Sequence, residues 1–306
     1  RREVIEWSEK LVRIGVIAPF LPLLLAVRER WPNDGRRYLE ILKLCEAYAF
    51  RVYRLTQYRA DAGRSALFRL GHDLSHHNVD FEGAVERLKW EIAYRCNDDE
   101  FKARTGKNHQ QMKAAYVWSG LRYFLYEYEI TLAKSKGGSP EVKWDDLRRG
   151  DLRNTIEHIL PQSIDNQPSW REAFPSPEIH QQYLHDIGNL TLTKHNPHLQ
   201  NKPFLSKKGI PGGNDFCYAN SPLFVERDLV NWDSWSPQTI EERKEMLLNW
   251  ARERWGVELN ERDAVRIEQS ESIETDEDVD PVADKYSDSL EDDDEDSHSP
   301  PFSSAV

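Results

Sequence analysis

Apolar residues recur at spacings of three and four through the first 135 positions of the chain, as they do along one face of an α-helix. One such stripe begins just after Asn33 and Asp34, two side chains that commonly cap a helix N-terminus. The three clearest stripes consist of Tyr38, Leu39, Leu42, Cys45, Ala49, Val52 and Tyr53; of Phe81, Val85, Leu88, Ile92 and Cys96; and of Met112, Ala115, Tyr116, Ser119, Tyr123 and Tyr126. Such stripes are typical of helices that pack on helices, so residues 1–138 are predicted to form a helical domain.

The most apolar run, VIAPFLPLLLAV at positions 16–27, contains two prolines. A membrane-spanning helix needs about 20 apolar residues, and this run is shorter. We therefore predict a buried core helix here and expect no membrane partner.

The pattern changes after SKGGSP at positions 135–140, a turn-rich sequence that suits a linker. Residues 139–258 combine two short β-prone runs, TIEHIL at 155–160 and NLTLT at 189–193, with loops that contain Pro and Gly. The helix-like run TIEERKEMLLNWARERW follows at 239–255. These patterns predict a mainly α protein with a small α+β domain at residues 139–258.

The negative charge of the chain is concentrated at its end. Residues 259–306 hold 17 of the 53 acidic residues but only 3 of the 41 basic ones, which leaves 36 acidic and 38 basic residues in 1–258. An acidic segment of this kind buries too little apolar surface to offset its ordering entropy, so 259–306 is predicted to be a disordered tail. Because the rest of the chain is close to neutral, the net charge of −12 does not exclude a nucleic-acid ligand.

The three cysteines, Cys45, Cys96 and Cys217, lie far apart and form no CxxC pair, which argues against a zinc ribbon or a disulfide scaffold. Reduced thiols and the lack of a visible signal peptide favour a cytoplasmic protein. No GxxxxGK[ST] phosphate loop occurs. The chain opens on Arg1 within a helix-like pattern, and we interpret it as a fragment of a longer protein.

Residues suited to phosphodiester hydrolysis gather between positions 157 and 208. The reaction requires a base for the attacking water and stabilisation of the charge that develops on phosphorus and on the leaving oxygen, which one histidine and one hard divalent cation can provide. Glu157 and His158 end the first β-prone run, and Asn189 opens the second. Neighbouring strand residues point to opposite faces, so Glu157 and His158 need a twist or loop if both are to take part.

A short helix is predicted next, because Asn196 precedes Pro197, a residue suited to a first helical turn. Three lysines suited to phosphate contacts follow: Lys202, Lys207 and Lys208. Each feature alone is commonplace, since Asn–Pro caps helices and lysines are usually solvated. Their occurrence together and in this order favours a nuclease.

His158, Asn189 and Asn196, laid over strand, strand and helix, resemble the HNH, or His-Me finger, nucleases. More closely, TIEHILPQ, GNLTL and NPHLQNKPFLSK are similar to the nuclease domain at the C-terminus of GmrSD-type, modification-dependent restriction enzymes, over roughly 140–256. Residues 1–135 resemble the all-α segment that joins this domain to an N-terminal nucleotide-hydrolysing domain. The DGQQR signature of that N-terminal domain does not occur here, so we expect the NTPase or sensor domain to be missing or separate.

The resemblance implies a ββα-metal core with Mg²⁺ or Mn²⁺ as cofactor. It implies that His158 is the general base, that Asn189 fixes the loop and orients the imidazole, and that Asn196 is a metal ligand. Glu157 stands where many HNH nucleases place an Asp ligand, so it is a second candidate ligand.

Other positions carry weaker expectations. The interval from Asn189 to Asn196 is shorter than is usual in the family, which leaves His195 or His198 as an alternative ligand. Asn201 and Lys207 match a family run and are expected to hold the helix or to touch phosphate. Five further histidines have no such context and are interpreted as surface or core residues: His72, His76, His77, His180 and His185.

The function implied by the resemblance is a metal-dependent DNA endonuclease of a restriction or phage-defence system, acting on modified or unmodified DNA. Three alternatives stay open: a catalytically idle module that binds nucleic acid or a partner, an RNase of the same fold, and a structural helical adaptor. Metal-dependent nicking of plasmid DNA separates the first of these from the endonuclease, and a comparison with structured RNA separates the second.

Overall fold

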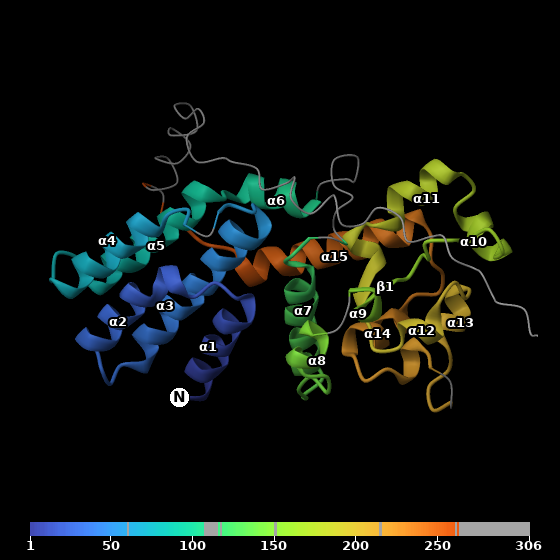
Figure 1. The fold of residues 1–306 in the computed structure, drawn as a ribbon, viewed down its shortest axis with the longest axis horizontal. Helices are drawn as coiled ribbons and strands as arrows, with labels where there is room; N and C mark the ends of the chain where they lie inside the picture. Colours follow the sequence, from blue (N-terminus) through green and yellow to red (C-terminus); the bar gives the residue numbers. More distant parts are fainter. Residues whose placement is uncertain are drawn as a thin grey trace, which may run out of the picture.

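The computed structural model describes residues 1–59, 61–106, 116, 118–149, 152–213, 216–260 and 262. Its first part consists of helices, drawn in blue and teal on the left of Figure 1. They are α1 (Arg2–Ile14), η1 (Ala18–Phe20), α2 (Leu21–Arg30), α3 (Gly35–Tyr48), the π-helical η2 (Ala49–Leu55), α4 (Arg64–Ser75), α5 (Phe81–Arg95) and α6 (Asp98–Gly106). Helix α2 packs against α4, and α1 packs against α3, so the predicted helix-on-helix packing is confirmed.

The first two predicted stripes form buried helix faces. Leu42 and Cys45 of α3 and Leu88 and Ile92 of α5 are each at most 1% exposed. Asp34 caps α3 as predicted, because its side chain accepts hydrogen bonds from two backbone N–H groups of the first turn.

The third predicted stripe does not form one helix. Residues 119–120 lie in a turn, and α7 (Leu121–Ser135) begins only after it. Tyr123 and Tyr126 on α7 are buried as the pattern predicts. Met112 and Ala115 lie outside the described residues.

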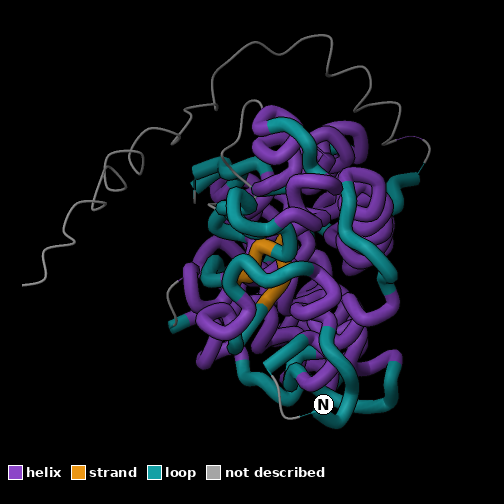
Figure 2. Tube along the Cα trace, turned by 90° about the vertical axis from the view of Figure 1, so that its right-hand side faces the viewer, coloured by secondary structure: helices purple, strands orange, loops and turns teal. Residues whose placement is uncertain are grey.

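The second part surrounds a small sheet, shown in orange in Figure 2. Strand β1 (Ile156–His158) pairs antiparallel with β2 (Leu190–Leu192), so both predicted β-prone runs are confirmed as strands. Short helices flank the sheet: α8 (Trp144–Arg148), α9 (Leu152–Thr155), α10 (Pro168–Ala173), α11 (Pro177–Leu184), η3 (Ile187–Asn189), α12 (Asn196–Leu199), α13 (Phe204–Lys208), η4 (Tyr218–Asn220), α14 (Phe224–Asp228) and η5 (Leu229–Asn231). The predicted class, mainly α with a small α+β part, is confirmed.

Helix α15 (Pro237–Trp255) joins the two parts, and Figure 1 shows it crossing the middle of the molecule. Its C-terminal residue Trp255 stacks on Phe50 of η2 at 3.6 Å between ring centroids. The neighbouring Arg254 forms ion pairs at 3.0 Å with Glu46 and with Glu127, two carboxylates with no side-chain exposure. Burial alone would raise the pKa of Glu127, but Arg254, Lys10 and other cations outweigh it and hold this pKa below its usual value. The helix is therefore anchored in the helical part by both apolar and charged contacts.

The hydrophobic core crosses the predicted domain boundary at residue 138. One cluster of buried side chains includes Leu11, Phe50, Leu125, Ile156, Leu190 and Trp255. A second cluster lies beneath the flanking helices and includes Ile159, Trp170, Phe204, Trp235 and Ile240. Because the first cluster contains residues of both parts, the division into a helical domain at 1–138 and a nuclease-like domain at 139–258 stays a prediction.

The apolar run at 16–27 forms η1 and most of α2, and Phe20, Leu23 and Val27 have no exposed surface, as predicted for a core helix. Among the described helices, none is both long and apolar enough to span a membrane. The predicted disordered tail at 259–306 lies outside the described residues, apart from positions 259, 260 and 262.

Candidate active site

The sheet places Glu157 and His158 on opposite sides of β1. In the register of the two strands, Glu157 lies opposite Thr191 and His158 lies opposite Leu190. Because neighbouring strand residues alternate between faces, the two side chains meet different surroundings. The Glu157 carboxylate contacts Lys207 and Tyr218, whereas the His158 ring contacts His185 and Tyr116.

Asn189 fastens the loop that leaves β1. Its Oδ1 accepts hydrogen bonds from the backbone N–H of Leu160 at 2.7 Å and from Nε1 of Trp235 at 3.0 Å. Its Nδ2 donates to the carbonyls of Leu160 at 3.1 Å and of Leu184 at 2.8 Å. These four bonds use the whole capacity of an amide side chain. These bonds agree with the predicted role of Asn189 in fixing the loop, and its predicted role in orienting the imidazole stays a prediction, with no direct hydrogen bond to the His158 ring among the described residues.

The turn before β2 is held by α15. Arg243 donates from Nη1 to the carbonyls of Gly188 at 2.7 Å and of Leu190 at 2.9 Å. A Cβ on Gly188 would come within 2.2 Å of the Ile240 carbonyl oxygen, so only glycine permits this approach of η3 to the helix. The helix that is anchored beside Phe50 thus also sets the position of Asn189.

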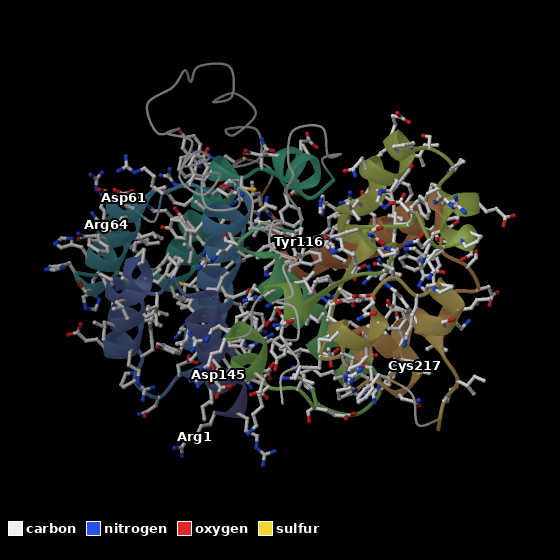
Figure 3. All side chains as sticks on the ribbon, turned by 45° about the vertical axis from the view of Figure 1, so that its right-hand side comes forward. Arg1, Asp61, Arg64, Tyr116, Asp145 and Cys217 are labelled. Carbon is white, nitrogen blue, oxygen red and sulfur yellow. The ribbon has the colours of Figure 1, made fainter. Side chains whose placement is uncertain are left out.

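His158 is a buried histidine with 7% of its surface exposed. Its Nε2 lies 3.0 Å from Nδ1 of His185, and the two rings are nearly perpendicular, at 70°. The Tyr116 ring, labelled near the middle of Figure 3, lies 4.6 Å from the His158 ring between centroids and 5.8 Å from the His185 ring. Burial, with further contributions from His185, Lys207 and His180, lowers the pKa of His158 to about 3. The ring is therefore neutral at pH 7 and can accept a proton.

Glu157 is committed to an internal ion pair. It is 2% exposed, its Oε1 lies 2.5 Å from Nζ of Lys207, and Tyr218 donates a hydrogen bond to it at 3.3 Å. Burial raises the pKa of Glu157, and Lys207 opposes that rise. The prediction that Glu157 is a metal ligand is corrected by this geometry, because its carboxylate points away from the His158 face and is already neutralised.

The three predicted phosphate-binding lysines lie in different environments. Lys207 is fully buried and, besides Glu157, donates to the carbonyls of His158 at 3.0 Å and of Ile159 at 3.1 Å, so the prediction that it touches phosphate is wrong. Its alternative expected role, holding the helix in place, agrees with these bonds. Lys208 donates to the Trp232 carbonyl at 2.8 Å and keeps 20% side-chain exposure. Lys202 is exposed, and its phosphate contact stays a prediction.

Asn196 begins α12 with Pro197 in the first turn, as predicted. Its Nδ2 donates to the Ile156 carbonyl at 3.3 Å, which ties the helix to β1. Asn196 and Pro197 line a surface depression of about 390 Å³ together with Asn154, Gln200 and Asn201.

His198 of α12 and the preceding His195 lie against Phe216, at 4.0 and 4.9 Å between ring centroids. The alternative role of these histidines as metal ligands stays a prediction.

A family model for the C-terminal domain of GmrSD restriction endonucleases matches residues 97–250, which is half of the chain. The chain belongs to this family. No curated protein and no solved structure matches the chain significantly. The matched range contains both strands, Asn189, Asn196 and the first part of α15, so the site lies within the part shared with these nucleases. It also begins at Asn97, immediately before α6 and ahead of the linker at 135–140.

In this GmrSD family member, the depression beside Asn196 is lined mainly by amide side chains. Asn196 and its neighbours in the depression offer carbonyl oxygens, the kind of ligand that Mg²⁺ and Mn²⁺ accept together with water and substrate phosphate. Within the described ranges, no three His, Cys, Asp or Glu side chains lie close enough together to hold a metal ion. A cation here would therefore take most of its remaining ligands from water and from the substrate.

Sequence reasoning missed two residues of the site. The sequence predicts an ordinary surface or core histidine at His185, but its Nδ1 lies 3.0 Å from Nε2 of His158. His180, which has the same prediction, is a core histidine that contacts the Pro161 carbonyl at 2.9 Å. One signal was available for His185: antiparallel pairing brings the start of β2 beside the end of β1, so residues just ahead of Asn189 are candidates. For Tyr116 the sequence offers no comparable signal.

Proposed function

We propose that this chain hydrolyses phosphodiester bonds in DNA by an HNH-type, metal-assisted mechanism, with His158 as the general base. The observation that supports this most directly is the placement of His158: the ring lies at the end of β1, within the range that the family model matches, and its position is fixed by the sheet and by the loop that Asn189 fastens. The family assignment supports the reaction class, because the family is one of restriction endonucleases.

In the proposed reaction, His158 removes a proton from water as the water attacks phosphorus in line with the leaving 3′ oxygen. A pKa of about 3 makes a weak base, but it belongs to the protein without substrate. The phosphodiester monoanion of bound DNA beside the ring favours the imidazolium and raises the pKa of His158, so we expect the base to become stronger when DNA is bound.

Asn196 is the proposed ligand for Mg²⁺ or Mn²⁺, with its neighbours at the depression as further amide donors. When bound, such a cation supplies a Lewis acid that stabilises negative charge on the phosphate oxygens. Asn196 of α12 donates to the carbonyl of Ile156, two residues before His158, so the proposed ligand is hydrogen-bonded to the strand that carries the base.

The test is cleavage of supercoiled plasmid with Mg²⁺, Mn²⁺ or EDTA by the parent chain and by His158→Ala. We expect metal-dependent cutting by the parent and a loss of at least about 10²-fold in His158→Ala, the contribution usual for a general base. The matched control is His72→Ala, since the His72 side chain is 62% exposed and lies on α4, away from the sheet. Equal cutting by His158→Ala and the parent would show that His158 is not the base. Preferential cutting of structured RNA would show that RNA, and not DNA, is the substrate.

A further inference from the structure

We infer that His185 is the residue that positions His158 for catalysis: it accepts a hydrogen bond from Nε2–H of His158 and so leaves the Nδ1 lone pair of His158 as the base. This inference rests on the proposed function for the role of His158. It assigns to the second imidazole the orienting role that sequence reasoning gave to Asn189.

The two facing ring nitrogens lie at an ordinary hydrogen-bonding distance. Nε2 of His158 and Nδ1 of His185 are 3.0 Å apart, within the usual range for a hydrogen bond between nitrogens. Two neutral imidazoles can share such a bond only if one of the two facing nitrogens carries a proton and the other a lone pair. If the proton is on His158 Nε2, the opposite nitrogen of that ring, Nδ1, is unprotonated and basic.

The opposite nitrogen is available for this task. Within the described part of the chain, no group is hydrogen-bonded to Nδ1 of His158, and this atom is not among the buried side-chain atoms that lack a partner. The 7% of the residue that remains exposed is therefore consistent with an Nδ1 atom that reaches solvent. A water can approach the ring from this side while Nε2 is held.

His185 is held in place by the end of α11 and by Asn189. His185 ends α11, and its backbone N–H donates to the Tyr183 carbonyl. The preceding residue, Leu184, accepts a hydrogen bond from Nδ2 of Asn189, the same atom that donates to the Leu160 carbonyl just beyond His158. Asn189 therefore fastens the loop that follows His158 to the end of α11, next to His185. Its effect on the imidazole is indirect and passes through His185.

Two substitutions at position 185 separate the hydrogen bond from simple packing. In His185→Asn, the side-chain Oδ1 can take the place of Nδ1 as an acceptor, whereas His185→Leu has a similar size and no acceptor. In plasmid cleavage with Mg²⁺, we expect His185→Leu to lower kcat by at least about tenfold with little change in KM, and His185→Asn to stay within about threefold of the parent.

A second measurement does not depend on cleavage. The nitrogen-15 chemical shifts of the His158 ring in the full chain report which ring nitrogen carries the proton. We expect the Nε2–H form in the parent and in His185→Asn, and a shift toward the Nδ1–H form in His185→Leu.

An Nδ1–H form of His158 in the parent would overturn the inference, as would a His185→Leu variant with parental kcat and an unchanged tautomer. If the shifts agree with expectation but the parent cuts neither DNA nor RNA, the proposed nuclease function fails while the hydrogen-bond assignment stands. If the parent cuts and its His158 ring is Nδ1–H, the nuclease function stands and the role of His185 fails.

Discussion

The carboxylate of Glu157 and the ammonium group of Lys207 lie 2.5 Å apart inside the protein, on the face of β1 opposite His158. The two residues are 50 positions apart in the sequence, and both are essentially without exposed side-chain surface. Lys207 also donates to the carbonyls of His158 and Ile159. The pair therefore holds the backbone of His158 from the opposite face of β1 and is unsuited to binding metal or phosphate.

Removal of one partner should destabilise the protein strongly. Lys207→Met leaves a buried carboxylate without its cation, which typically costs about 3–5 kcal/mol in the free energy of unfolding. Urea denaturation followed by circular dichroism measures this cost. The double variant Glu157→Leu, Lys207→Met removes both charges and should recover a large part of it. A loss below about 1 kcal/mol in Lys207→Met would contradict the buried pair.

Replacing Asn189 should lower the free energy of unfolding far more than replacing Thr191, a buried residue of β2. Asn189→Ala leaves the Leu160 N–H, two carbonyls and the Trp235 indole without a partner, and each buried orphan costs about 1–3 kcal/mol. The expected loss in the free energy of unfolding exceeds about 3 kcal/mol. Thr191→Val is the matched control, because Thr191 is fully buried and its hydroxyl has no hydrogen-bond partner within the part of the chain that the structure describes. Equal losses in the two variants would refute this role of Asn189.

Because His158 is buried, the free energy of unfolding should decrease as the pH is lowered. Its pKa is lowered to about 3 by burial first and by His185 next, whereas in the unfolded chain it is near the ordinary 6.5. Between these values the unfolded state binds more protons, so the free energy of unfolding rises with pH and falls on acidification, by up to about 1.4 kcal/mol per pH unit. We expect His158→Phe to remove this slope between pH 7 and pH 5. Parallel pH profiles for the two proteins would contradict the burial of the ring.

Glu226 should have the opposite effect, because its ionisation lowers the free energy of unfolding as the pH rises. It is fully buried, and burial raises its pKa to about 8 although Ser221 donates a hydrogen bond to it at 2.5 Å. The folded state holds a proton that the unfolded state loses near pH 4.5, so this stability is complete below pH 4.5 and is lost as pH rises through 8. Glu226→Gln should flatten the decline in melting temperature between pH 6 and pH 9. The exposed Glu245→Gln serves as the control, and an unchanged decline in Glu226→Gln would show that Glu226 is ionised in the fold.

Lys202 is the predicted phosphate contact that the fold leaves exposed. If it binds DNA, Lys202→Gln should weaken binding of the inactive His158→Ala background and reduce the salt slope of log Kd by about 1. Fluorescence anisotropy at several salt concentrations measures both values. Lys136→Gln, an exposed lysine that follows α7, should leave them unchanged. Identical slopes for Lys202→Gln and the parent would remove Lys202 from the interface.

The sequence by itself determined the helices with clear three- and four-residue periodicity, the two strands, and the order of His158, Asn189 and Asn196. These features are local: α3 and α5 follow from apolar stripes, and α12 follows from Asn196 and Pro197. The resemblance to GmrSD nucleases was likewise carried by short runs whose residues are neighbours in the chain.

Only the tertiary structure decided which partners these side chains have. Lys207 looked like a solvated lysine because its sequence neighbours are polar and basic, but its partner Glu157 comes from a distant strand. His185 looked ordinary because nothing within a few positions explains it, and its contact with His158 is made across the sheet and a loop fastened by Asn189. Burial, pairing and pKa depend on residues that are far apart in sequence, so they are set when the core closes around β1 and α15.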